Sequence, residues 1–503
     1  MIRATRLVIM MSILAVAVRL ICIDQPYLDN WSWRQSDVAA IARNYFQGGF
    51  HFAHPQIDWA GDESGYVGTE FPILPFLAAI CYKIFGVHEW VGRVQALTLF
   101  AVSLPFFFLL VRKIFGETAA TWALFFYGFA PVGIMAGRCF MPDMPSLALS
   151  IIGLYFFRRW IDESELGTGR VRPIGGPEWR ARSTSFFVSA FCISLSILIK
   201  LPSILVGAPL ACLALQRFGS SSFKRFDLWF FAAIALLPSV FWYGHAYQIA
   251  LQFYPHHFFG AGGVQIMSAE WYLKISKEIV TSTLTPVIFV LGCVGILAAR
   301  SIARARMFQW WLAAMILFIV IVGYGNRHQW YQLPLIPIAA PFAGAACAFV
   351  GPKISSRAMR IALSIMLAAS FGFSAFVYAR DFYQPSAALL RDAGLVLKRI
   401  TPATALVVAA DNGDPTVLYY AERKGWHFLE KNGIYDGEPR DSAQAIVDLE
   451  ALRRRGAGYL GFTSNTLWWL DYYEEFGQYV QKTSTLVEAT SEFRIYKLNP
   501  VLK

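Results

Sequence analysis

The sequence predicts a polytopic α-helical membrane protein that carries one small α/β domain at its C-terminus. Of its 503 residues, 56% are hydrophobic and only 15% are charged, and the mean hydropathy is +0.46. A water-soluble chain of this length could not bury so much apolar surface. The aromatic share of 16% fits the same class, because Trp and Tyr gather where a bilayer meets water.

A helix needs about 17–25 mostly apolar residues to cross the hydrocarbon core of a membrane. Runs of roughly this length predict about eleven transmembrane helices, and the two on either side of Lys200 and Pro202 are the shortest. The predicted spans lie near residues 4–23, 92–112, 118–136, 142–159, 184–199, 201–216, 226–248, 280–299, 307–325, 332–350 and 360–380. One further apolar run, 72–88, is ambiguous, and the charges of the loops decide it.

If 72–88 does not cross the membrane and the N-terminus is cytoplasmic, nearly all basic loops fall on one side. These loops are 112–113, 158–183, 217–225, 300–306 and 353–360. Because Lys and Arg are retained in cytoplasmic loops, we predict that 72–88 is a helix on the outer surface. Phe76, Tyr82 and Trp90 are its expected interfacial aromatic residues.

The last part of the chain predicts a separate domain. The run 403–410 is apolar and β-prone, a turn follows at 411–415, and helix-like stretches at 415–424 and 441–456 lead into 459–462. Strands that alternate with helices indicate a small α/β domain. We therefore predict a transmembrane domain over 1–380, with a first external loop at 24–91, and a soluble domain over 381–503. No phosphate-binding loop is found in it, so it is assigned no chemistry.

Charge and cysteine content exclude two classes of function. The net charge of +11 does not indicate nucleic acid, because the basic residues lie in short loops where they set membrane orientation. The seven cysteines lie in or beside apolar segments, and the sequence has no CxxC motif. Neither a disulfide framework nor a zinc site is predicted.

The predicted topology places ten ionisable residues at one face of the membrane, although they are scattered along the sequence. They are Asp29, Asp37, Arg43, Glu70, Arg138, Asp143, Lys200, His245, Arg327 and His328. Ionisable side chains are costly at a membrane and often mark function. Carboxylates mixed with cations suit an anionic substrate and a general base, but a transporter vestibule would contain a similar mixture.

Several segments resemble the GT-C class glycosyltransferases, and most closely the protein O-mannosyltransferases and the lipid A aminoarabinose transferases. The resemblance covers most of 1–380 and lies in residues 33–46, 69–72, 85–93, 138–143, 199–202 and 327–337, in the family's order. It implies a GT-C fold and transfer of a sugar from a polyprenyl-phosphate donor to a hydroxyl group on the non-cytoplasmic side, with inversion. A lipid-linked donor requires no nucleotide-binding glycine loop, and none is present.

The resemblance leaves several partners open. The acceptor is a lipid, a polysaccharide or a protein, and no nucleic acid is expected.

The compact loops favour a bacterial inner membrane, with the active site and the C-terminal domain facing the periplasm and with membrane lipids around the spans. The alternative function is that of a transporter or flippase for an anionic lipid-linked sugar, which predicts pseudo-symmetric halves.

The family places its catalytic base in the first external loop, usually in an Asp-Glu pair. Alignment of Ile41-Ala42-Arg43 with the family's helix puts Arg34 and Gln35 where that pair is expected. Asp37 lies almost one helical turn further on, on nearly the same face, and is the first candidate for the base, with Asp29 second. Arg34, Gln35 and Arg43 are then candidates for contacts with the acceptor. The structural alternative for Asp37 is that it only solvates a surface helix.

The family match also indicates roles for two other carboxylates. Glu70 is a candidate for orienting the acceptor, and Asp143 matches the family's second external carboxylate. Their structural alternatives are stabilisation of a helix dipole for Glu70 and capping of a helix N-terminus for Asp143. A divalent metal held by Glu70 and His245 is a further option, although a lone histidine is usually structural.

A departing phosphate needs cations. Lys200 lies between two apolar runs with no acidic neighbour in the sequence, which is a costly place for an ammonium group unless an anion binds. Arg327, His328 and Tyr331 form a second candidate phosphate-binding cluster, and Arg138 is a third. The alternatives are a lysine that extends to the interface and an ordinary interfacial loop.

Overall fold

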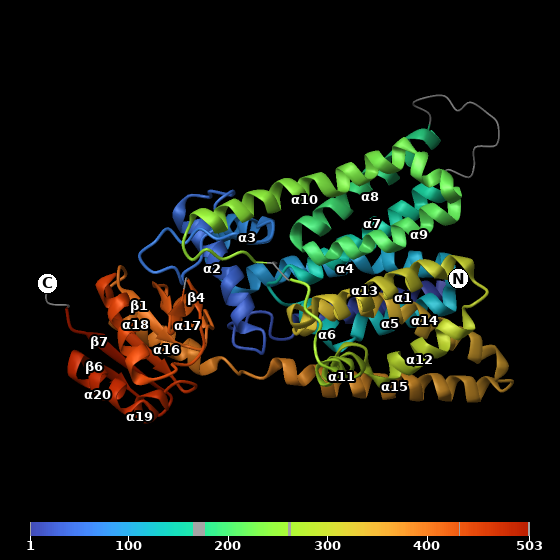
Figure 1. Cartoon of the computed structure of the whole chain (residues 1–503). Helices are drawn as coiled ribbons and strands as arrows, with labels where there is room; N and C mark the ends of the chain where they lie inside the picture. Colours follow the sequence, from blue (N-terminus) through green and yellow to red (C-terminus); the bar gives the residue numbers. More distant parts are fainter. Residues whose placement is uncertain (1, 164–176, 260–262, 432, 501–503) are drawn as a thin grey trace. The chain divides into compact units, whose positions relative to one another are not determined.

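The computed structural model describes residues 2–163, 177–259, 263–431 and 433–500 (Figure 1). The basic loop predicted at 158–183 lies partly outside this range. The chain forms two compact units. The helical unit comprises 1–23, 93–242 and 261–381, and the loop–sheet unit comprises 24–92, 243–260 and 382–503.

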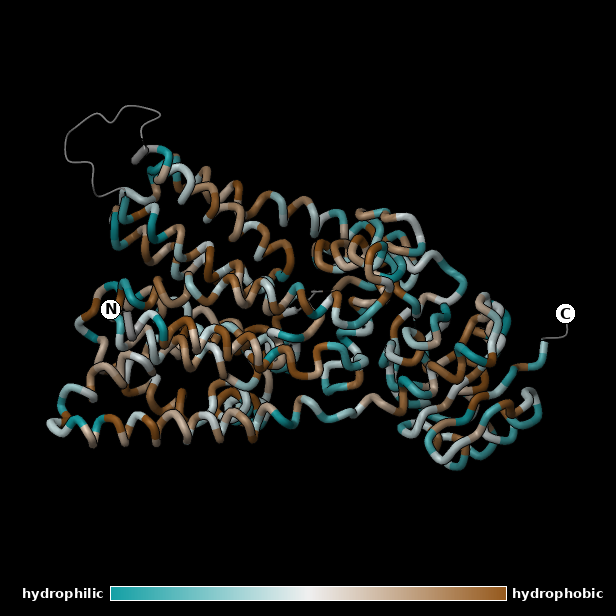
Figure 2. Tube along the Cα trace, turned by 180° about the vertical axis from the view of Figure 1, so that it is seen from behind, coloured by the Kyte–Doolittle hydropathy of each residue, from teal (hydrophilic) through white to brown (hydrophobic). Residues whose placement is uncertain are grey.

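The helical unit consists mainly of apolar helices, most of which are long. Their bounds are α1 Ile2–Leu20, α4 Glu89–Phe115, α5 Glu117–Phe129, α6 Pro131–Ala136, α7 Asp143–Glu163, α8 Pro177–Ile199, α9 Gly207–Phe218, α10 Phe226–Gln252, α11 Ala269–Glu278, α12 Thr285–Ala298, α13 Arg306–Val322, α14 Leu335–Val350 and α15 Arg357–Arg380. The first residues of α4 and the last residues of α10 belong to the other unit. In Figure 2 these helices are mostly brown along their length, with teal residues near their ends.

Seven helical segments within the described residues are long and apolar enough to cross a membrane, and they coincide with seven of the predicted spans. An eighth candidate is the pair Ala269–Thr283 and Thr285–Ala298, which is bent by 100°. At the other three predicted positions the chain forms α1, α5 with α6, and α7, which the same criterion does not select. The chain is thus an integral membrane protein with fewer clear spans than predicted, because α5 is short and α7 ends in a cluster of charges.

The ambiguous run forms α3, Ile73–Phe85, a helix of 13 residues. At 1.5 Å per residue it reaches about 20 Å, which is too short for a hydrocarbon core of about 30 Å. The expected interfacial aromatics are only partly correct, because Tyr82 is buried and Phe76 packs on Tyr45. The exposed apolar residues are instead Leu77, Ile80, Ile84 and Phe85.

The loop–sheet unit contains the α/β domain predicted at the C-terminus. Its sheet has the strand order β2-β1-β5-β7-β6. Strands β2, β1 and β5 are parallel, and β7 runs antiparallel to both of its neighbours, β5 and β6. The strands are β1 Leu406–Ala410, β2 Lys424–His427, β5 Ala457–Thr463, β6 Ser484–Ala489 and β7 Phe493–Leu498, and β3 Glu430–Lys431 pairs with β4 Ile434–Tyr435. The helices are α2 Ser32–Gly48, α3, α16 Ala388–Ile400, α17 Thr416–Ala421, α18 Ser442–Arg454, α19 Trp469–Tyr472 and α20 Glu474–Thr483.

The two faces of β1 belong to different hydrophobic cores. Val408 and Ala410 pack in a core with residues of α18 and α20. Val407 and Ala409 face the opposite way, as alternation along a strand requires, and pack in a core with Ile41 of α2 and other residues of the first external loop. The division therefore differs from the predicted boundaries, since 24–92 shares a core with the C-terminal segment.

A loop segment of the first external loop also pairs with the edge strand β2. Gly425 N donates to the carbonyl of Asp58, and Gly61 N donates to the carbonyl of Gly425 over 2.7 Å. Gly61 has a φ of +61°, and a Cβ there would lie 1.9 Å from the indole ring of Trp426. Only glycine meets both requirements, so this contact depends on the residue type at position 61.

Candidate functional site

The helix that carries the first candidate base begins at a buried carboxylate. Asp29 Oδ1 accepts hydrogen bonds from Trp31 N over 3.1 Å and from Gln35 Nε2 over 2.9 Å. Side-chain acceptors of this kind satisfy the free N–H groups at a helix start. The structure therefore gives Asp29 and Gln35 a role in starting α2. Nearly all of α2 is buried.

Asp37, Arg34 and Glu70 form one buried cluster in the loop–sheet unit. The guanidinium of Arg34 donates to both carboxylate oxygens of Glu70, over 2.8 and 2.9 Å. It also donates to Asp37 Oδ2 over 3.3 Å from the same helix face. Thr69 donates to Glu70 over 3.0 Å. Arg34 thus holds the two predicted carboxylates at fixed positions.

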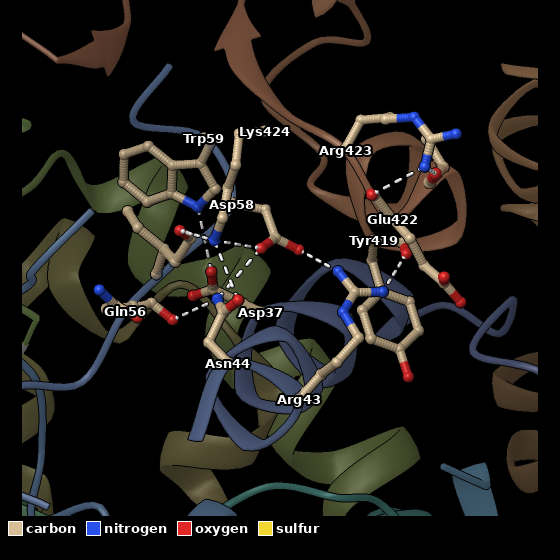
Figure 3. Close-up of polar contacts among 12 residues, drawn as sticks. Asp37, Arg43, Asn44, Gln56, Asp58, Trp59, Tyr419, Glu422, Arg423 and Lys424 are labelled. Atoms are coloured by element: carbon tan, nitrogen blue, oxygen red, sulfur yellow. Dashed lines mark hydrogen bonds and ion pairs between the residues drawn. The ribbon is translucent and has the colours of Figure 1, made fainter. Parts of the chain in front are cut away.

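The second oxygen of Asp37 binds an aromatic side chain that sequence reasoning did not select. Trp59 Nε1 donates to Asp37 Oδ1 over 3.1 Å, and Figure 3 shows the indole pointing at the carboxylate. Burial raises the pKa of Asp37 above its ordinary value, against the opposing effects of Arg34, the Trp59 hydrogen bond and His427, while Glu70 adds to the rise. Such a carboxylate is a better proton acceptor than a solvated one once it is ionised.

Two histidine rings pack close to the ring of Trp59. The ring of His257 lies 5.7 Å from the Trp59 ring, and its pKa is lowered to about 4 by burial and by the charge of Arg34. The ring of His427, at the end of β2, lies 5.4 Å from the same indole. His427 Nδ1 lies 2.8 Å from Asp411 Oδ1, so that the imidazole donates to the carboxylate.

Asp411 and His427 were not candidates in the sequence, which gave the C-terminal segment no chemistry. Asp411 directly follows β1 and His427 is the last residue of β2, and these two strands are parallel neighbours in the sheet. Polar residues at the carboxyl ends of parallel strands commonly line ligand sites. This rule could have selected Asp411 and His427 from the sequence, provided that β1 and β2 had been recognised as adjacent parallel strands.

A separate ionic network involves Arg43, which had been a candidate for an acceptor contact. Arg43 forms an ion pair with Asp58 and donates to the carbonyl of Tyr419 over 2.5 Å. Asp58 also accepts from Lys424 over 2.9 Å and from Asn44 over 3.0 Å (Figure 3). These contacts join α2 to β2 and α17 and give Arg43 a structural role.

Two other predicted site residues meet in the helical unit. Pro202 cannot continue a helix, so α8 ends at Ile199, and Lys200 begins the 3-10 helix η1 Leu201–Val206. Lys200 Nζ lies 3.4 Å from Asp143 Oδ1, and both side chains are buried. No acidic residue lies near Lys200 in the sequence, but the fold brings the distant Asp143 next to it.

Serine hydroxyls and small side chains bring α7 and α8 close enough for this pair. Ser146 Oγ donates to the carbonyl of Ser196 over 2.7 Å, and the hydroxyls of Ser150 and Ser196 are 2.7 Å apart. A Cβ at Gly153 would lie 2.6 Å from Ile193. Small residues and hydroxyl pairs are typical of close helix packing in membranes.

The aromatic ring of Tyr331 completes this second cluster. Its centroid lies 4.8 Å from Lys200 Nζ, within the range of a cation–π contact. Tyr331 lies in the 3-10 helix η6 Gln329–Gln332, where the ring of His328 stacks on Trp330 at 4.4 Å. A pocket lined in part by Asp143, Lys200 and Tyr331 opens at this position.

The remaining cation candidates have other surroundings. Arg327 is exposed and packs over the ring of Tyr324 at 4.3 Å. Arg138 is fully buried and donates to the carbonyl of Cys22 over 2.5 Å. Arg138 thus fixes the end of the first apolar segment, a role that the sequence did not predict.

The two residues of the suggested metal pair contact other groups in the structure. His245 Nε2 lies 2.8 Å from the carbonyl oxygen of Ala53, whereas the carboxylate of Glu70 is bound by Arg34. Within the described residues there is no group of three or more His, Cys, Asp or Glu side chains that could hold a metal ion. The metal role of Glu70 and His245 stays a prediction.

Comparison with known proteins was made at the level of sequence and of fold. Residues 69–170 match the family of dolichyl-phosphate-mannose-protein mannosyltransferases. No curated protein sequence matches the chain.

Solved structures resemble nearly the whole chain. ArnT from Cupriavidus metallidurans in the apo state has a TM-score of 0.64 and 16% identity, over 98% of each chain. The same protein bound to undecaprenyl phosphate gives 0.62 and 15%, over 97% of each chain. The oligosaccharyltransferase from Archaeoglobus fulgidus in the apo form gives 0.65 and 14%, over 92% of this chain and 70% of that one. The predicted resemblance is thereby confirmed: the chain has the GT-C fold, of the type found in ArnT and the protein O-mannosyltransferases.

Proposed function

We propose that the protein is a membrane glycosyltransferase that transfers a sugar from a polyprenyl-phosphate donor to a hydroxyl group of a cell-envelope acceptor. The acceptor is a lipid, a polysaccharide or a protein. The shared fold supports this proposal, because ArnT was solved with undecaprenyl phosphate and the Archaeoglobus fulgidus enzyme with dolichol phosphate. The reaction takes place on the non-cytoplasmic side of a bacterial inner membrane.

The buried carboxylate of Asp37 is the observation that carries the proposal. A hydroxyl group is a weak nucleophile, so the reaction needs a base at the acceptor oxygen. In the reaction the acceptor oxygen forms a bond to the anomeric carbon and its proton passes to Asp37. The bond from that carbon to the phosphate oxygen breaks, and the polyprenyl phosphate leaves with the electron pair. One displacement of this kind inverts the anomeric carbon.

Arg34 and Glu70 prepare Asp37 for this role. Arg34 contacts both carboxylates, so that its charge limits the cost of two buried acids in one cluster. The bond from Trp59 holds the other carboxylate oxygen. Glu70 is then the partner that orients Arg34, and a direct contact of Glu70 with the acceptor is not required.

Lys200 is the proposed cation for the donor phosphate. Fixed positive charge stabilises a leaving phosphate more strongly in a dry site than in water. Asp143 pairs with the ammonium group and orients it while no phosphate is bound, and the ring of Tyr331 lies 4.8 Å from it. Arg327 and His328 are placed on the neighbouring turns and are secondary candidates.

Asp37→Asn tests the base. Loss of the proton acceptor should lower kcat by about 10²–10⁴-fold, whereas binding of the donor should persist. The assay follows release of undecaprenyl phosphate from a panel of undecaprenyl-phosphate sugars by the full chain in lipid nanodiscs. Asp29→Asn is the matched control for a buried carboxylate on the same segment. Unchanged turnover in Asp37→Asn would remove Asp37 from the mechanism.

Lys200→Ala tests the phosphate site. The expected loss of affinity for undecaprenyl phosphate is about 10–100-fold, as for removal of a bond between charged groups. Lys353→Ala is the control, because Lys353 also lies over an aromatic ring, that of Phe349 at 3.8 Å. Equal affinities of wild type and Lys200→Ala would exclude Lys200.

A transporter for an anionic lipid-linked sugar is the second candidate function. The observation that favours it is the pair α11 and α12, whose axes are bent by 100°, since broken helices often form transport sites. A flux assay in vesicles separates the two functions. Exchange of the lipid-linked sugar across the membrane without cleavage of the phosphate bond would overturn the enzyme proposal.

A further inference from the structure

The C-terminal part of the loop–sheet unit contains a buried ionic pair that the proposed mechanism does not use. His427 and Asp411 have exposed fractions of 4% and 0%, and their side chains are 2.8 Å apart. Burying such a pair costs desolvation energy that apolar residues would avoid, so it is weak evidence for a role in stability alone. Its position at the carboxyl ends of β1 and β2 suggests a role in a site.

Trp59 connects this pair to the proposed base. Its Nε1 donates to Asp37 Oδ1 over 3.1 Å, while its ring lies 5.4 Å from the ring of His427 at an interplanar angle of 39°. The indole ring thus packs against the histidine ring, and its Nε1 meets the carboxylate. The contact joins the first external loop to the carboxyl end of β2 within a single compact unit.

The charged groups that act on His427 are all carboxylates. His427 faces Asp411 and Asp414 from the turn after β1, and Asp37 from α2. Burial lowers the pKa of His427, but the charge and the hydrogen bond of Asp411 outweigh it, so that the pKa lies above its ordinary value. Burial raises the pKa of Asp414 to about 6, so this carboxylate is still mostly ionised near neutral pH and adds to the negative charge that faces His427.

Asp37 in turn faces four groups. Arg34 donates to its Oδ2 and Trp59 donates to its Oδ1, and the charges of Glu70 and His427 also act on it. Arg34 is shared with Glu70, so its single charge serves two carboxylates. A protonated His427 places a second positive charge near Asp37, while its own partner Asp411 is a further carboxylate of the same cluster.

We propose that His427, held protonated by Asp411, is a positioning residue that keeps the carboxylate of Asp37 ionised. The inference deepens the proposed function, on which it rests, by naming the group that prepares the base. The imidazolium contacts neither donor nor acceptor, and acts on Asp37 by its charge and through the packing of Trp59. The C-terminal α/β domain thereby has a part in catalysis, which the sequence alone did not indicate.

The test measures the ionisation of Asp37 directly, without substrate. The full chain, carrying ¹³C-carboxyl-labelled aspartate in lipid nanodiscs, is titrated by infrared difference spectroscopy, and the Asp37 band is assigned by its loss in Asp37→Asn. In His427→Gln the midpoint of the Asp37 titration should rise by about one pH unit, because a nearby positive charge has been removed. An unchanged midpoint would overturn the proposal.

His257→Gln is the matched control. His257 packs on the same indole at a similar distance, 5.7 Å, but it is neutral because its pKa is about 4. A role of packing alone would shift the Asp37 midpoint equally in both variants, and this result would also overturn the proposal. A shift in His427→Gln alone supports it.

Asp411→Asn gives a second variant in case His427→Gln does not fold. The histidine remains, but it loses the anion that keeps it protonated, so the Asp37 midpoint should rise in the same direction. The double variant should show no larger shift than His427→Gln, because Asp411 acts through His427. If Asp37→Asn retained sugar transfer while these shifts were found, the base assignment would fail and the ionic coupling would stand.

Discussion

At the scale of single residues, the fold gives buried charged groups partners that are not their neighbours in the sequence. Asp37 meets Trp59, His427 acts on Asp37, and Lys200 meets Asp143. A carboxylate or an ammonium group in an apolar region is costly by itself, and each of these partners lowers that cost.

The raised pKa of Asp37 predicts the acid limit of activity. The base works only when it is ionised, and its ionised fraction falls as the pH drops through its pKa. Because burial raises that pKa above the ordinary value of 3.8, kcat/KM should fall at a higher pH than a solvated aspartate would give. A pH profile of undecaprenyl phosphate release measures this, and an acid limb at or below 3.8 would contradict it.

The sequence was sufficient to select candidate site residues, but it could not show which residues they contact. The resemblance to the GT-C class selected Asp37, Glu70, Asp143 and Lys200 as candidates. It could not show that Lys200 contacts Asp143, since the contact depends on the packing of α7 on α8. It also missed His427, because the pairing of β1 with β2 joins residues that no local pattern connects.

At the scale of elements, the approach of α7 to α8 decides where Lys200 lies. A Cβ at Gly153 would be 2.6 Å from the Ile193 side chain and 3.3 Å from the Ile193 backbone nitrogen. Gly153→Val should therefore separate the helices and weaken the binding of undecaprenyl phosphate about 10-fold or more. Binding measured in nanodiscs checks this.

Gly292→Val is the matched control for that prediction. Gly292 faces Ala339 of α14, and a Cβ at Gly292 would lie at an ordinary contact distance of 3.8 Å or more. Its effect on undecaprenyl phosphate binding should be small. Equal losses in both variants would indicate general damage to the helical unit, and unchanged binding in Gly153→Val would contradict the role given to this helix contact.

The ionic contacts between α2 and β2 predict a specific loss of stability. Burial raises the pKa of Asp58, but Lys424 and Arg43 outweigh it and hold the pKa below its ordinary value. Asp58→Asn leaves Arg43 buried without its charge partner and should lower the free energy of unfolding by ~3–5 kcal/mol. Thermal unfolding of the full chain measures this.

The lowered pKa of Asp58 also determines the pH at which its contribution to the free energy of unfolding is lost. For a lowered pKa the stabilisation is complete above the pKa of the unfolded state and is lost as the pH falls through that of the folded state. The difference between wild type and Asp58→Asn should therefore shrink only in acid, below the ordinary value of 3.8. Asp62→Asn is the control, because its ion pair with Arg455 is exposed and contributes about 0–1 kcal/mol.

At the scale of the whole molecule, composition and loop charge were sufficient to predict a polytopic membrane protein with a small α/β domain. The helix 73–85 shows why the loop charges were needed, since its apolar residues alone would suggest a span. The two compact units were not predictable in the same way. The first external loop and the C-terminal segment share a core around β1, and no local pattern marks residues that are more than 300 positions apart.

The central claim is that Asp37 is the base of a sugar transfer from a polyprenyl phosphate in the cell envelope. It is tested most directly by mass spectrometry of cell-envelope glycans and lipids from three strains. One strain makes the wild-type protein, one lacks it, and one makes Asp37→Asn at an equal level in the membrane. We predict a sugar modification that is present with the wild type and absent from both other strains. A modification that persists with Asp37→Asn, or no difference among the three strains, would contradict the claim.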